Sequence, residues 1–380
     1  MLYRKFGHTD FHVSALGFGS MRLPVLEGDA GKVDETKAVE MIRYAIDHGV
    51  NYVDTAYLYH QGQSEILVAK ALRDGYREKV KLATKLPVWL TEHYEDFDRY
   101  LNEQLEKLGT DHIDFYLLHA LNRNTWPKAK EAGVLRFLDR AAADGRIGYA
   151  GFSFHDEEKL FEEIIDAYSW TFCQMQYNYM DTNIQAGTEG LNYAAAKGLA
   201  VIIMEPIKGG KLAANPPRAV QELWASAPTE RTPAEWALRW VWNHPQVSLV
   251  LSGMSTMEQV QENVRIAAEA EPNSLTSEEL RLIGEVRKTY AALTKVGCTG
   301  CGYCLPCPSG VDIPRNFALY NDAYIYDQLD ASVMAYQNLL EEGARASACV
   351  ECGECESVCP QQLNIRIYLK EVHRTLSRGN

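Results

Sequence analysis

The chain alternates short runs of β-branched and aromatic residues with longer segments whose apolar residues recur at helical spacing. The longer segments include Asp34–His48, Asp96–Leu108, Asp156–Ala167 and Pro233–His244. Eight strands alternating with helices predict an α/β fold, a closed (β/α)8 TIM barrel, followed by a smaller, mostly helical domain. The predicted strands are Val13–Phe18, Asn51–Asp54, Val80–Thr84, Asp114–Leu118, Gly148–Phe152, Phe172–Met175, Leu199–Met204 and Ser248–Leu251.

An open dinucleotide-binding sheet is the competing fold, and its first strand would be followed by GxGxxG. The nearest string, Gly17-Phe-Gly19-Ser-Met-Arg22, lacks the last glycine, which favours the barrel. Two helix starts carry capping-box patterns, Thr232-Pro-Ala-Glu235 and Thr276-Ser-Glu-Glu279.

Composition excludes several classes of protein. The 380 residues are 46% hydrophobic and 23% charged, as in ordinary globular proteins. The net charge of −13, from 38 basic and 51 acidic residues, argues against nucleic acid or an anionic membrane as partner. No apolar run approaches the ~20 residues of a membrane span, and the N-terminal residues lack the apolar core of a signal peptide. We therefore expect a cytoplasmic protein.

The cysteines divide the chain in two. Eight of the 9 cysteines lie between Cys298 and Cys359, and the ninth, Cys173, is expected to be a buried thiol on a strand. Such crowding in a cytosolic chain favours metal ligation over disulfides. The predicted domains are a barrel over 1–272, a connecting helix over 273–296 and a cysteine-rich domain over 297–380. Helical patterns at Pro314–Ala323 and Asp327–Glu342 separate the two cysteine motifs.

Four ionisable side chains lie at or after the ends of consecutive predicted strands: Asp54, Tyr59, Lys85 and His119. Active sites of barrels are built at that end of the strands. Each residue also has a structural interpretation, because histidines at strand ends, tyrosines in loops and aspartates before threonine commonly serve packing or capping. A lysine entering a barrel mouth needs a partner for its charge, so the four together favour one site.

The chain resembles the aldo-keto reductase family over about residues 1–270. The resemblance is carried by Gly17-Phe-Gly19-Ser-Met, Asp54-Thr-Ala-x-x-Tyr59, Ala83-Thr-Lys85, Asp114-x-x-x-Leu-His119, Gly145-Arg-Ile-Gly-Tyr-Ala-Gly-Phe-Ser153, Gln174-Met-Gln-Tyr-Asn178 and Gln259-Val-Gln-Glu-Asn263. It implies an NAD(P)H-dependent reduction of an aldehyde or ketone, with Asp54, Tyr59, Lys85 and His119 as the catalytic tetrad. Tyr59 would give a proton to the reduced carbonyl oxygen, and we expect the Lys85 ammonium to lower the pKa of that phenol.

The same resemblance implies the nucleotide contacts. Ser153 and Gln174 would hold the carboxamide, although Phe154 and Met204 replace residues that the family often has nearby. Where an arginine often clamps a 2′-phosphate, this chain has Gln259, which could instead cap a helix with Thr256. We expect NADP, with NAD as the alternative. The implied cofactor-binding residues are Gly19, Ser20, Met21, Asp54, Ser153, Gln174, Met204, Pro206, Ile207, Gly209, Gly210, Ser255, Gln259 and Asn263. Leu86, Trp89 and Asn122 are candidates for the substrate pocket, and for Trp89 plain core packing is an equal alternative.

Two cysteine motifs dominate the tail. They are Cys298-Thr-Gly-Cys301-Gly-Tyr-Cys304-Leu-Pro-Cys307-Pro308 and Cys349-Val-Glu-Cys352-Gly-Glu-Cys355-Glu-Ser-Val-Cys359-Pro360. The second has the C-x2-C-x2-C-x3-C-P spacing of bacterial ferredoxins. Structural zinc usually takes two separated C-x2-C pairs, so the spacing predicts two [4Fe-4S] clusters, with zinc or another metal as the alternative.

The tail resembles ferredoxin-type domains, in which the cysteine before proline serves the other cluster. By that resemblance Cys298, Cys301, Cys304 and Cys359 would hold one cluster, and Cys307, Cys349, Cys352 and Cys355 the second. The whole chain is similar to the aldo-keto reductase subgroup that carries such an iron–sulfur tail.

The two halves allow three hypotheses, since hydride transfer moves two electrons and a cluster exchanges one. In the first hypothesis, the barrel is a reductase of a small carbonyl substrate and the clusters shape the tail. Alternatively, the clusters pass electrons between a redox partner protein and the barrel. In the third hypothesis the chain is an iron–sulfur electron-transfer protein whose barrel binds a nucleotide or partner without turnover, and the intact tetrad argues against it.

Overall fold

The computed structural model describes residues 1–326 and 328–377. These residues form two compact units, each made of two chain segments. The barrel unit comprises Met1–Pro206 and Leu238–Ser274, and the cysteine unit comprises Ile207–Ala237 and the chain from Leu275 onward. The domain boundaries predicted from the sequence are continuous segments and stay a prediction.

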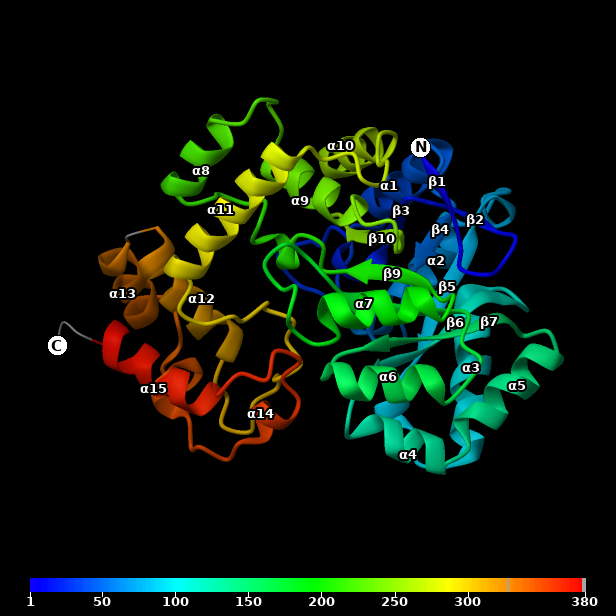
Figure 1. Cartoon of the computed structure of the whole chain (residues 1–380). Coiled ribbons are helices and arrows are strands. Elements are labelled where there is room, and N and C mark those ends of the chain that lie inside the picture. The colour runs from blue at the N-terminus through cyan, green and yellow to red at the C-terminus, as the bar shows by residue number, and fades with distance from the viewer. Residues whose placement is uncertain (327, 378–380) are drawn as a thin grey trace. The chain divides into compact units, whose positions relative to one another are not determined.

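Eight parallel strands close the barrel in the order β10-β3-β4-β5-β6-β7-β8-β9, so that each strand pairs with its neighbours in the sequence (Figure 1). Their bounds are β3 Leu16–Gly19, β4 Tyr52–Asp54, β5 Lys81–Leu86, β6 Ile113–Leu121, β7 Ile147–Phe154, β8 Phe172–Gln176, β9 Ala200–Met204 and β10 Val247–Gly253. All eight coincide with predicted strands, and the predicted barrel is confirmed. A parallel barrel is buried on both faces, which is why its strands read as continuous apolar runs.

The first predicted strand, Val13–Phe18, was too long, because the chain turns at Ala15. Its first half belongs to an antiparallel hairpin of β1 (Tyr3–Lys5) and β2 (His12–Ser14). This hairpin places Phe6 against Phe115, with ring centroids 4.7 Å apart, in a cluster that fills the N-terminal end of the strands. Polar side chains are therefore left to the opposite end of the barrel.

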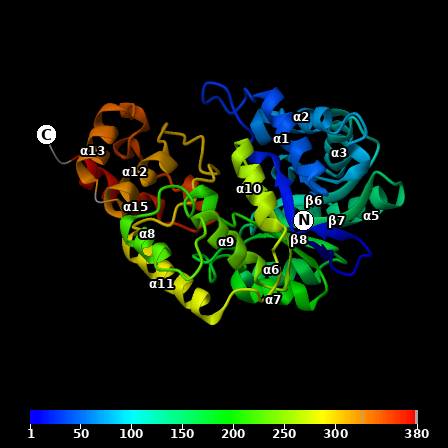
Figure 2. The ribbon, with the colours of Figure 1, turned by 90° about the horizontal axis from the view of Figure 1, so that it is seen from above.

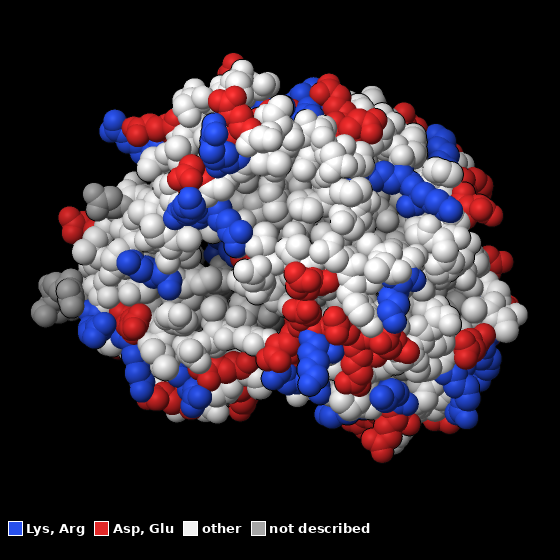
Figure 3. Space-filling view, in the orientation of Figure 1, with Lys and Arg blue, Asp and Glu red and all other residues white. Residues whose placement is uncertain are grey.

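Helices surround the strands. In Figure 2, α1, α2, α3 and α5 follow one another around the outside of the barrel, and neighbouring helices in this series pack together. The helices of the barrel unit are α1 Glu35–Asp47, α2 Ser64–Ala71, α3 Tyr94–Leu108, α4 Thr125–Glu131, α5 Val134–Ala143, α6 Glu158–Asp166, α7 Gly187–Ala196 and α10 Met257–Ala267. The chain passes between the units within α9 (Pro233–Trp242). Acidic side chains gather over the face that carries α6, with basic ones among them (Figure 3).

Short 3-10 helices punctuate the loops. They are η1 Ser20–Arg22, η2 Tyr59–Gly62, η3 Arg77–Lys79, η4 Val88–Leu90, η5 Lys208–Gly210, η6 Glu342–Ala344 and η7 Ala346–Ala348. In the parts of the chain described, no helix combines the length and the hydropathy needed to cross a membrane.

The cysteine unit is built from helices around a small core of its own. Its helices are α8 Arg218–Ala225, α11 Ser277–Leu293, α12 Ile313–Ile325, α13 Leu329–Asn338, α14 Glu354–Ser357 and α15 Ile365–Leu376. Helices α12, α13 and α15 pack on one another and bury Phe317, Tyr336 and Val372. Two helices therefore lie between the cysteine motifs as predicted, although Asp327, where the second was expected to begin, lies outside the described residues.

The predicted helix caps were partly confirmed. Thr276 and Glu279 form a full capping box at the start of α11, since each side chain accepts a hydrogen bond from the other's backbone N–H. At α9 the Thr232 hydroxyl accepts from the Glu235 N–H at 3.0 Å. Glu235 also faces Arg231, with charged atoms 3.9 Å apart.

The packing predicts the effect of one methyl group inside the barrel wall. A Cβ at Gly151 in β7 would lie 2.5 Å from Cζ of Phe172, a fully buried ring. Overpacking costs about 1–3 kcal/mol, so Gly151→Ala should lower the free energy of unfolding by that amount in urea denaturation. As a control, Gly284→Ala in α11 adds a methyl group into open space and should stabilise by about 0.5–1 kcal/mol. An unchanged midpoint for Gly151→Ala would contradict the tight packing of Phe172.

Candidate active site and cysteine cavities

The structure brings the predicted tetrad together at the C-terminal end of the barrel. Asp54 is the last residue of β4, Lys85 lies near the end of β5, and His119 lies near the end of β6. Tyr59 begins η2, just after β4. Because parallel strands end at the same rim, neighbouring strands deliver these side chains to one point.

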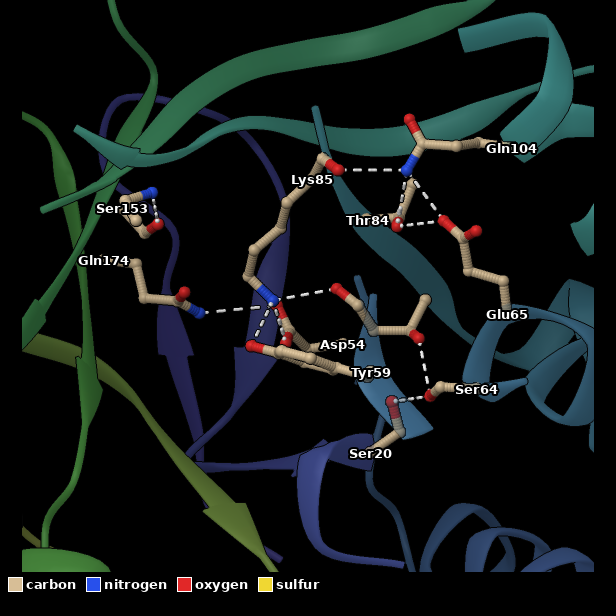
Figure 4. A network of polar contacts seen from close by, with 12 residues as sticks. Ser20, Asp54, Tyr59, Ser64, Glu65, Thr84, Lys85, Gln104, Ser153 and Gln174 are labelled. Carbon is tan, nitrogen blue, oxygen red and sulfur yellow. Dashed lines mark hydrogen bonds and ion pairs between the residues drawn. The ribbon is translucent and has the colours of Figure 1, made fainter. Parts of the chain in front are cut away.

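A buried ion pair forms the centre of this cluster (Figure 4). The Lys85 ammonium lies 2.5 Å from Asp54 Oδ1 and also donates to the Thr55 carbonyl at 2.8 Å. Both charged side chains are only 1% exposed. Burial raises the pKa of the Asp54 carboxyl and lowers that of the Lys85 ammonium, and the charge of each partner opposes the shift of the other. Neither charge could be buried here alone.

Tyr59 lies beside this ion pair and remains partly exposed. Its hydroxyl is 3.4 Å from Lys85 Nζ, which also lies 4.8 Å from the centre of the Tyr59 ring. Burial of the phenol and, second, the Asp54 carboxylate raise the pKa of Tyr59. The net lowering expected from Lys85 is therefore not what the structure gives, and Tyr59 keeps its proton at neutral pH.

The turn that carries Tyr59 is unusual. His60 and Gln61, the next two residues, have left-handed backbone angles, with φ of 52° and 55°. The His60 ring bridges the Leu23 N–H at 3.2 Å and the Ala30 carbonyl at 2.9 Å. Such conformations persist only where their surroundings hold them, and these bonds hold the turn in front of β4.

His119 lies at an irregularity of its strand. The pairing of β6 with β7 shifts register between Leu118 and Leu121, and Ala120 has a φ of 55°. The Ala120 N–H donates to the Ser153 hydroxyl at 2.7 Å, which fixes the irregular segment to β7. Bulges of this kind redirect a side chain, and here the His119 ring stands edge-on to Tyr59, with centroids 5.9 Å apart.

The electrostatic surroundings keep His119 neutral. Burial, the charge of Lys85 and the nearby His155 hold the pKa of His119 well below its usual range. Its Nδ1 is buried and finds no hydrogen-bond partner among the described residues. The Trp89 ring packs on the same imidazole at 5.0 Å and is itself 38% exposed, so Trp89 borders the site instead of lying in the core.

A second polar network, formed with residues of α2 and α3, holds the backbone of Lys85, and it was not predicted from the sequence. Glu65 of α2, fully buried, accepts from the Thr84 hydroxyl and from Gln104 Nε2, each at 2.7 Å. Gln104 of α3 also donates to the Lys85 carbonyl at 3.0 Å. The signal was present, because Gln104 is a polar residue on the face of α3 that buries Phe97, Leu101 and Leu108.

The residues expected at the nicotinamide lie next to the ion pair. Gln174 of β8 donates to Asp54 Oδ2 at 3.4 Å, and Ser153 of β7 lies beside Gln174 (Figure 4). Both side chains are buried. Gly19 ends β3, where its pairing partner on β4 is Asp54. The barrel rim thus gathers Gly19, Asp54, Ser153 and Gln174 with the tetrad.

Other expected nucleotide residues at this rim have different environments. Ser20 is buried and shares a hydrogen bond of 2.7 Å with Ser64, whereas Met21 is 44% exposed. Met204 ends β9 and Pro206 follows it as a buried residue.

Ile207, Gly209 and Gly210, expected around the pyrophosphate, belong to the cysteine unit. They form a compact turn in which the Leu212 N–H returns to the Ile207 carbonyl at 3.2 Å. The next residue after the glycines, Lys211, donates from Nζ to the carbonyl of Cys298. This loop is therefore tied to the first cysteine motif, a connection that the sequence did not reveal.

The residues expected near the adenosine make local bonds around α10. Gln259 Oε1 accepts from the Ser255 N–H at 2.8 Å, and the Thr256 hydroxyl accepts from the Gln259 N–H at 3.3 Å. The alternative interpretation of Gln259 as a helix-capping residue is therefore present. Asn263, buried, donates to Ser252 Oγ at 3.1 Å.

The eight cysteines of the tail line two separate cavities, and Cys173 is a buried thiol as expected. The first cysteine cavity is lined by Cys298, Cys301, Cys304 and Cys359. The second cysteine cavity is lined by Cys307, Cys349, Cys352 and Cys355. The grouping is the crossed one implied by the ferredoxin resemblance, in which each motif lends its last cysteine to the other.

Electrostatics shows the same grouping. Burial raises the pKa of the Cys304 thiol to about 12, and the charges of Cys301, Cys298 and Cys359 add to this. Burial likewise raises the pKa of Cys355 to about 11, with added effects from Glu356, Cys349, Cys352 and Cys307. Four thiolates around one cavity would repel one another, so a set that is fully ionised requires a cationic group between its members. Among residues 1–326 and 328–377, no three His, Cys, Asp or Glu side chains, the tail cysteines included, are placed to hold a single metal ion.

The geometry defines an α/β-barrel oxidoreductase site joined to a domain with two four-cysteine cavities, and comparison with known proteins agrees. Residues 15–288 match the aldo/keto reductase family, and residues 297–363 match the 4Fe-4S dicluster domain. The chain therefore belongs to the aldo/keto reductase family, and it carries a C-terminal 4Fe-4S dicluster domain. The predicted family resemblance is confirmed.

Several relatives share the barrel. The structure of aldo-keto reductase AKR11C1 from Bacillus halodurans, in its holo form, is 31% identical, with a TM-score of 0.63, over 75% of this chain and 96% of that chain. The uncharacterized oxidoreductase YrpG of Bacillus subtilis is 26% identical over 330 residues, which are 75% of this chain and 96% of YrpG. The L-galactose dehydrogenase of Arabidopsis thaliana is 25% identical over 318 residues, covering 77% of this chain and 96% of that enzyme.

The environment of Glu65 predicts how stability depends on pH. Burial raises the pKa of Glu65 above its ordinary value of 4.5. When folding raises the pKa of a carboxyl group, the protonated group stabilises the fold. This stabilisation is fully present below the ordinary pKa and is lost as the pH rises through the raised pKa. Glu65→Gln keeps an acceptor for Thr84 and Gln104 but does not ionise. The variant and the wild type should therefore be equally stable at acid pH, and the variant should become the more stable of the two toward neutral pH.

Thermal unfolding across this pH range would measure the difference. Glu106→Gln, on the exposed surface of α3, serves as the matched control and should track the wild type throughout. A Glu65→Gln protein that loses stability as the pH rises would contradict the assigned environment.

Proposed function

We propose that the protein reduces an aldehyde or ketone with NAD(P)H, and that Tyr59 donates the proton. The observation that carries this proposal is the buried Lys85–Asp54 ion pair with the Tyr59 hydroxyl 3.4 Å from the ammonium. A bound nicotinamide would supply the hydride. The remaining requirement is a group that protonates the oxygen as negative charge develops on it.

Tyr59 meets that requirement in its protonated state. Its raised pKa keeps the proton on the phenol at neutral pH, and an alkoxide is a stronger base than a phenolate, so transfer toward substrate is downhill. The phenolate formed is stabilised by the Lys85 ammonium, which Asp54 holds in place. His119, held neutral, can donate one hydrogen bond to the same carbonyl oxygen and so orient it.

The residues around the ion pair fit a nicotinamide. Ser153 and Gln174 offer a hydroxyl and an amide beside Asp54, and these groups complement a carboxamide, which both donates and accepts. Within the barrel unit, Gly19, Ser20, Met21, Met204 and Pro206 are the further proposed contacts, with Ser255, Gln259 and Asn263 toward the adenosine. The assignment of Ile207, Gly209 and Gly210 to the pyrophosphate stays a prediction from the family resemblance. NADP remains the expected nucleotide and NAD the alternative.

The chemical class of the substrate is a small carbonyl compound. The name of the Arabidopsis relative, L-galactose dehydrogenase, adds a sugar to the candidates. A panel of aliphatic, aromatic and sugar carbonyls, assayed in both directions, therefore covers the proposal.

We also propose that each cysteine cavity holds a [4Fe-4S] cluster. Each cavity is lined by four thiols, and the motif spacing together with the match to the 4Fe-4S dicluster domain favours a four-iron group over a single zinc ion. When bound, the clusters supply one-electron redox chemistry or structural cross-linking. The chain's own contribution is to hold the thiolates and to shield them with the core of α12 and α15.

Replacing Tyr59 tests the catalytic proposal. Tyr59→Phe removes the proton and leaves the ring, so carbonyl-dependent NAD(P)H oxidation should fall by about 10²–10⁴-fold while nucleotide binding stays. Tyr57→Phe is the matched control from the same loop, since the Tyr57 hydroxyl is bonded to Glu103 at 2.7 Å, and it should keep near-full activity. A Tyr59→Phe protein that binds nucleotide and keeps wild-type turnover would show that another group is the acid.

The two cavities also favour a second candidate function, an electron-transfer protein whose barrel binds without turnover. The same assay separates the two. An anaerobically purified protein with reducible clusters and no nucleotide oxidation on any carbonyl would support the second candidate.

Paired cysteine replacements test the ligand sets. The wild type should contain about eight iron atoms per chain, four in each cluster. The Cys307→Ala, Cys352→Ala double variant removes two thiols from one cavity and should retain about four. The Cys304→Ala, Cys352→Ala double variant disturbs both cavities and should retain fewer. Equal iron content in the two double variants would contradict the crossed grouping.

A further inference from the structure

The two cysteine cavities differ in the charges that surround them. The first cysteine cavity is completed by apolar residues, among them Ile313, Phe317 and Leu363, and no Asp, Glu, Lys or Arg lines it among the described residues. The second cysteine cavity is lined by a cation, Arg366. Its ligand Cys352 is exposed, whereas the four thiols of the first cavity are each partly buried.

Arg366 is held in place by the residue that follows a ligand. Glu356 comes directly after Cys355, and its Oε2 accepts from Arg366 Nη2 at 2.8 Å and from Nε at 3.0 Å. Its other oxygen accepts from the Arg366 backbone N–H at 2.9 Å. The three bonds fix both the guanidinium and the start of α15.

The guanidinium of Arg366 lies beside a glycine of the ligand loop. A Cβ at Gly353 would lie 3.6 Å from Arg366 Cζ and 3.7 Å from its Nη1, which is ordinary van der Waals contact. The guanidinium therefore packs against the Cys352–Cys355 loop. Arg366 lines the second cysteine cavity and Glu356 does not, although the charge of Glu356 acts on the ligand Cys355.

Reduction of a [4Fe-4S] cluster adds one negative charge. A neighbouring cation and access of solvent stabilise that charge, whereas an apolar surrounding disfavours it. The lining cation Arg366 and the exposed ligand Cys352 favour the reduced state in the second cavity, and the charge of Glu356 next to Cys355 opposes it. Lys211 contacts the Cys298 carbonyl but does not line the first cavity.

We infer that the cluster in the second cysteine cavity has the higher reduction potential and is the one that exchanges electrons with the outside, and that Arg366, positioned by Glu356, sets this difference. The inference rests on the proposed [4Fe-4S] clusters. Each step moves one electron from an external reductant to one cluster, which passes from its oxidised to its reduced state without a change of ligands.

The test is a dithionite titration of the whole, anaerobically purified protein with redox mediators, followed by electron paramagnetic resonance. Two reduction waves are expected. In Arg366→Gln the midpoint potential of the higher wave should fall by about 59 mV, which is a tenfold change in the equilibrium constant of a one-electron reduction. In Glu356→Gln the same wave should move up, because the guanidinium loses its counter-charge. The lower wave should stay in place in both variants.

Two further variants complete the experiment. Cys352→Ser marks the signal of the second cavity, because only that cluster loses a thiolate. Lys288→Gln is the control, since Lys288 pairs with Glu285 at 2.8 Å on α11 and does not line either cavity. It should leave both waves unchanged.

The outcomes are distinct. Unmoved waves in both Arg366→Gln and Glu356→Gln, or a higher wave that Cys352→Ser leaves intact, would overturn the inference. An iron content far below two clusters, or no [4Fe-4S] signal after reduction, would instead overturn the proposed clusters themselves.

Discussion

The barrel site depends on one interaction, the ion pair between Lys85 and Asp54 inside the rim of the barrel. Two opposite charges that are each 1% exposed can be kept there only as a pair. Burial of the phenol and the Asp54 carboxylate raise the pKa of Tyr59, whose hydroxyl lies 3.4 Å from the ammonium. In this arrangement Tyr59 carries the proton that it can donate, and the Lys85 ammonium lies close enough to stabilise the phenolate that forms when the proton leaves.

The surrounding structure serves to hold that pair. The Glu65, Thr84 and Gln104 network fixes the backbone of Lys85 from the outer side of the barrel. The bulge at Ala120 ties the His119 segment to Ser153. In the cysteine unit, helix α12 and helix α15 play the corresponding part, because their core lies under both sets of thiols. In both units a rigid apolar scaffold positions a small number of charged or ionisable groups.

Most of this architecture could be predicted from the sequence, because eight apolar runs with helical spacing between them leave few alternatives to a barrel. The ends of those runs also indicated Asp54, Lys85 and His119. The exceptions have local causes. The Val13–Phe18 run hides a turn at Ala15, since both halves are equally apolar. The pKa of Tyr59 is raised by burial and by the Asp54 carboxylate, and no sequence pattern contains the depth at which the phenol is buried. The pairing of Arg366 with Glu356 joins residues ten positions apart through a turn, and it has no helical or strand periodicity.

A double-mutant cycle on Asp54 and Tyr59 tests the central claim most directly. If Asp54 acts on catalysis only by holding Lys85 beside the phenol, Asp54→Asn should reduce kcat at saturating nucleotide in the wild type and should have no further effect in Tyr59→Phe. Equal losses in the two backgrounds would mean that Asp54 and Tyr59 act independently, and they would contradict the account.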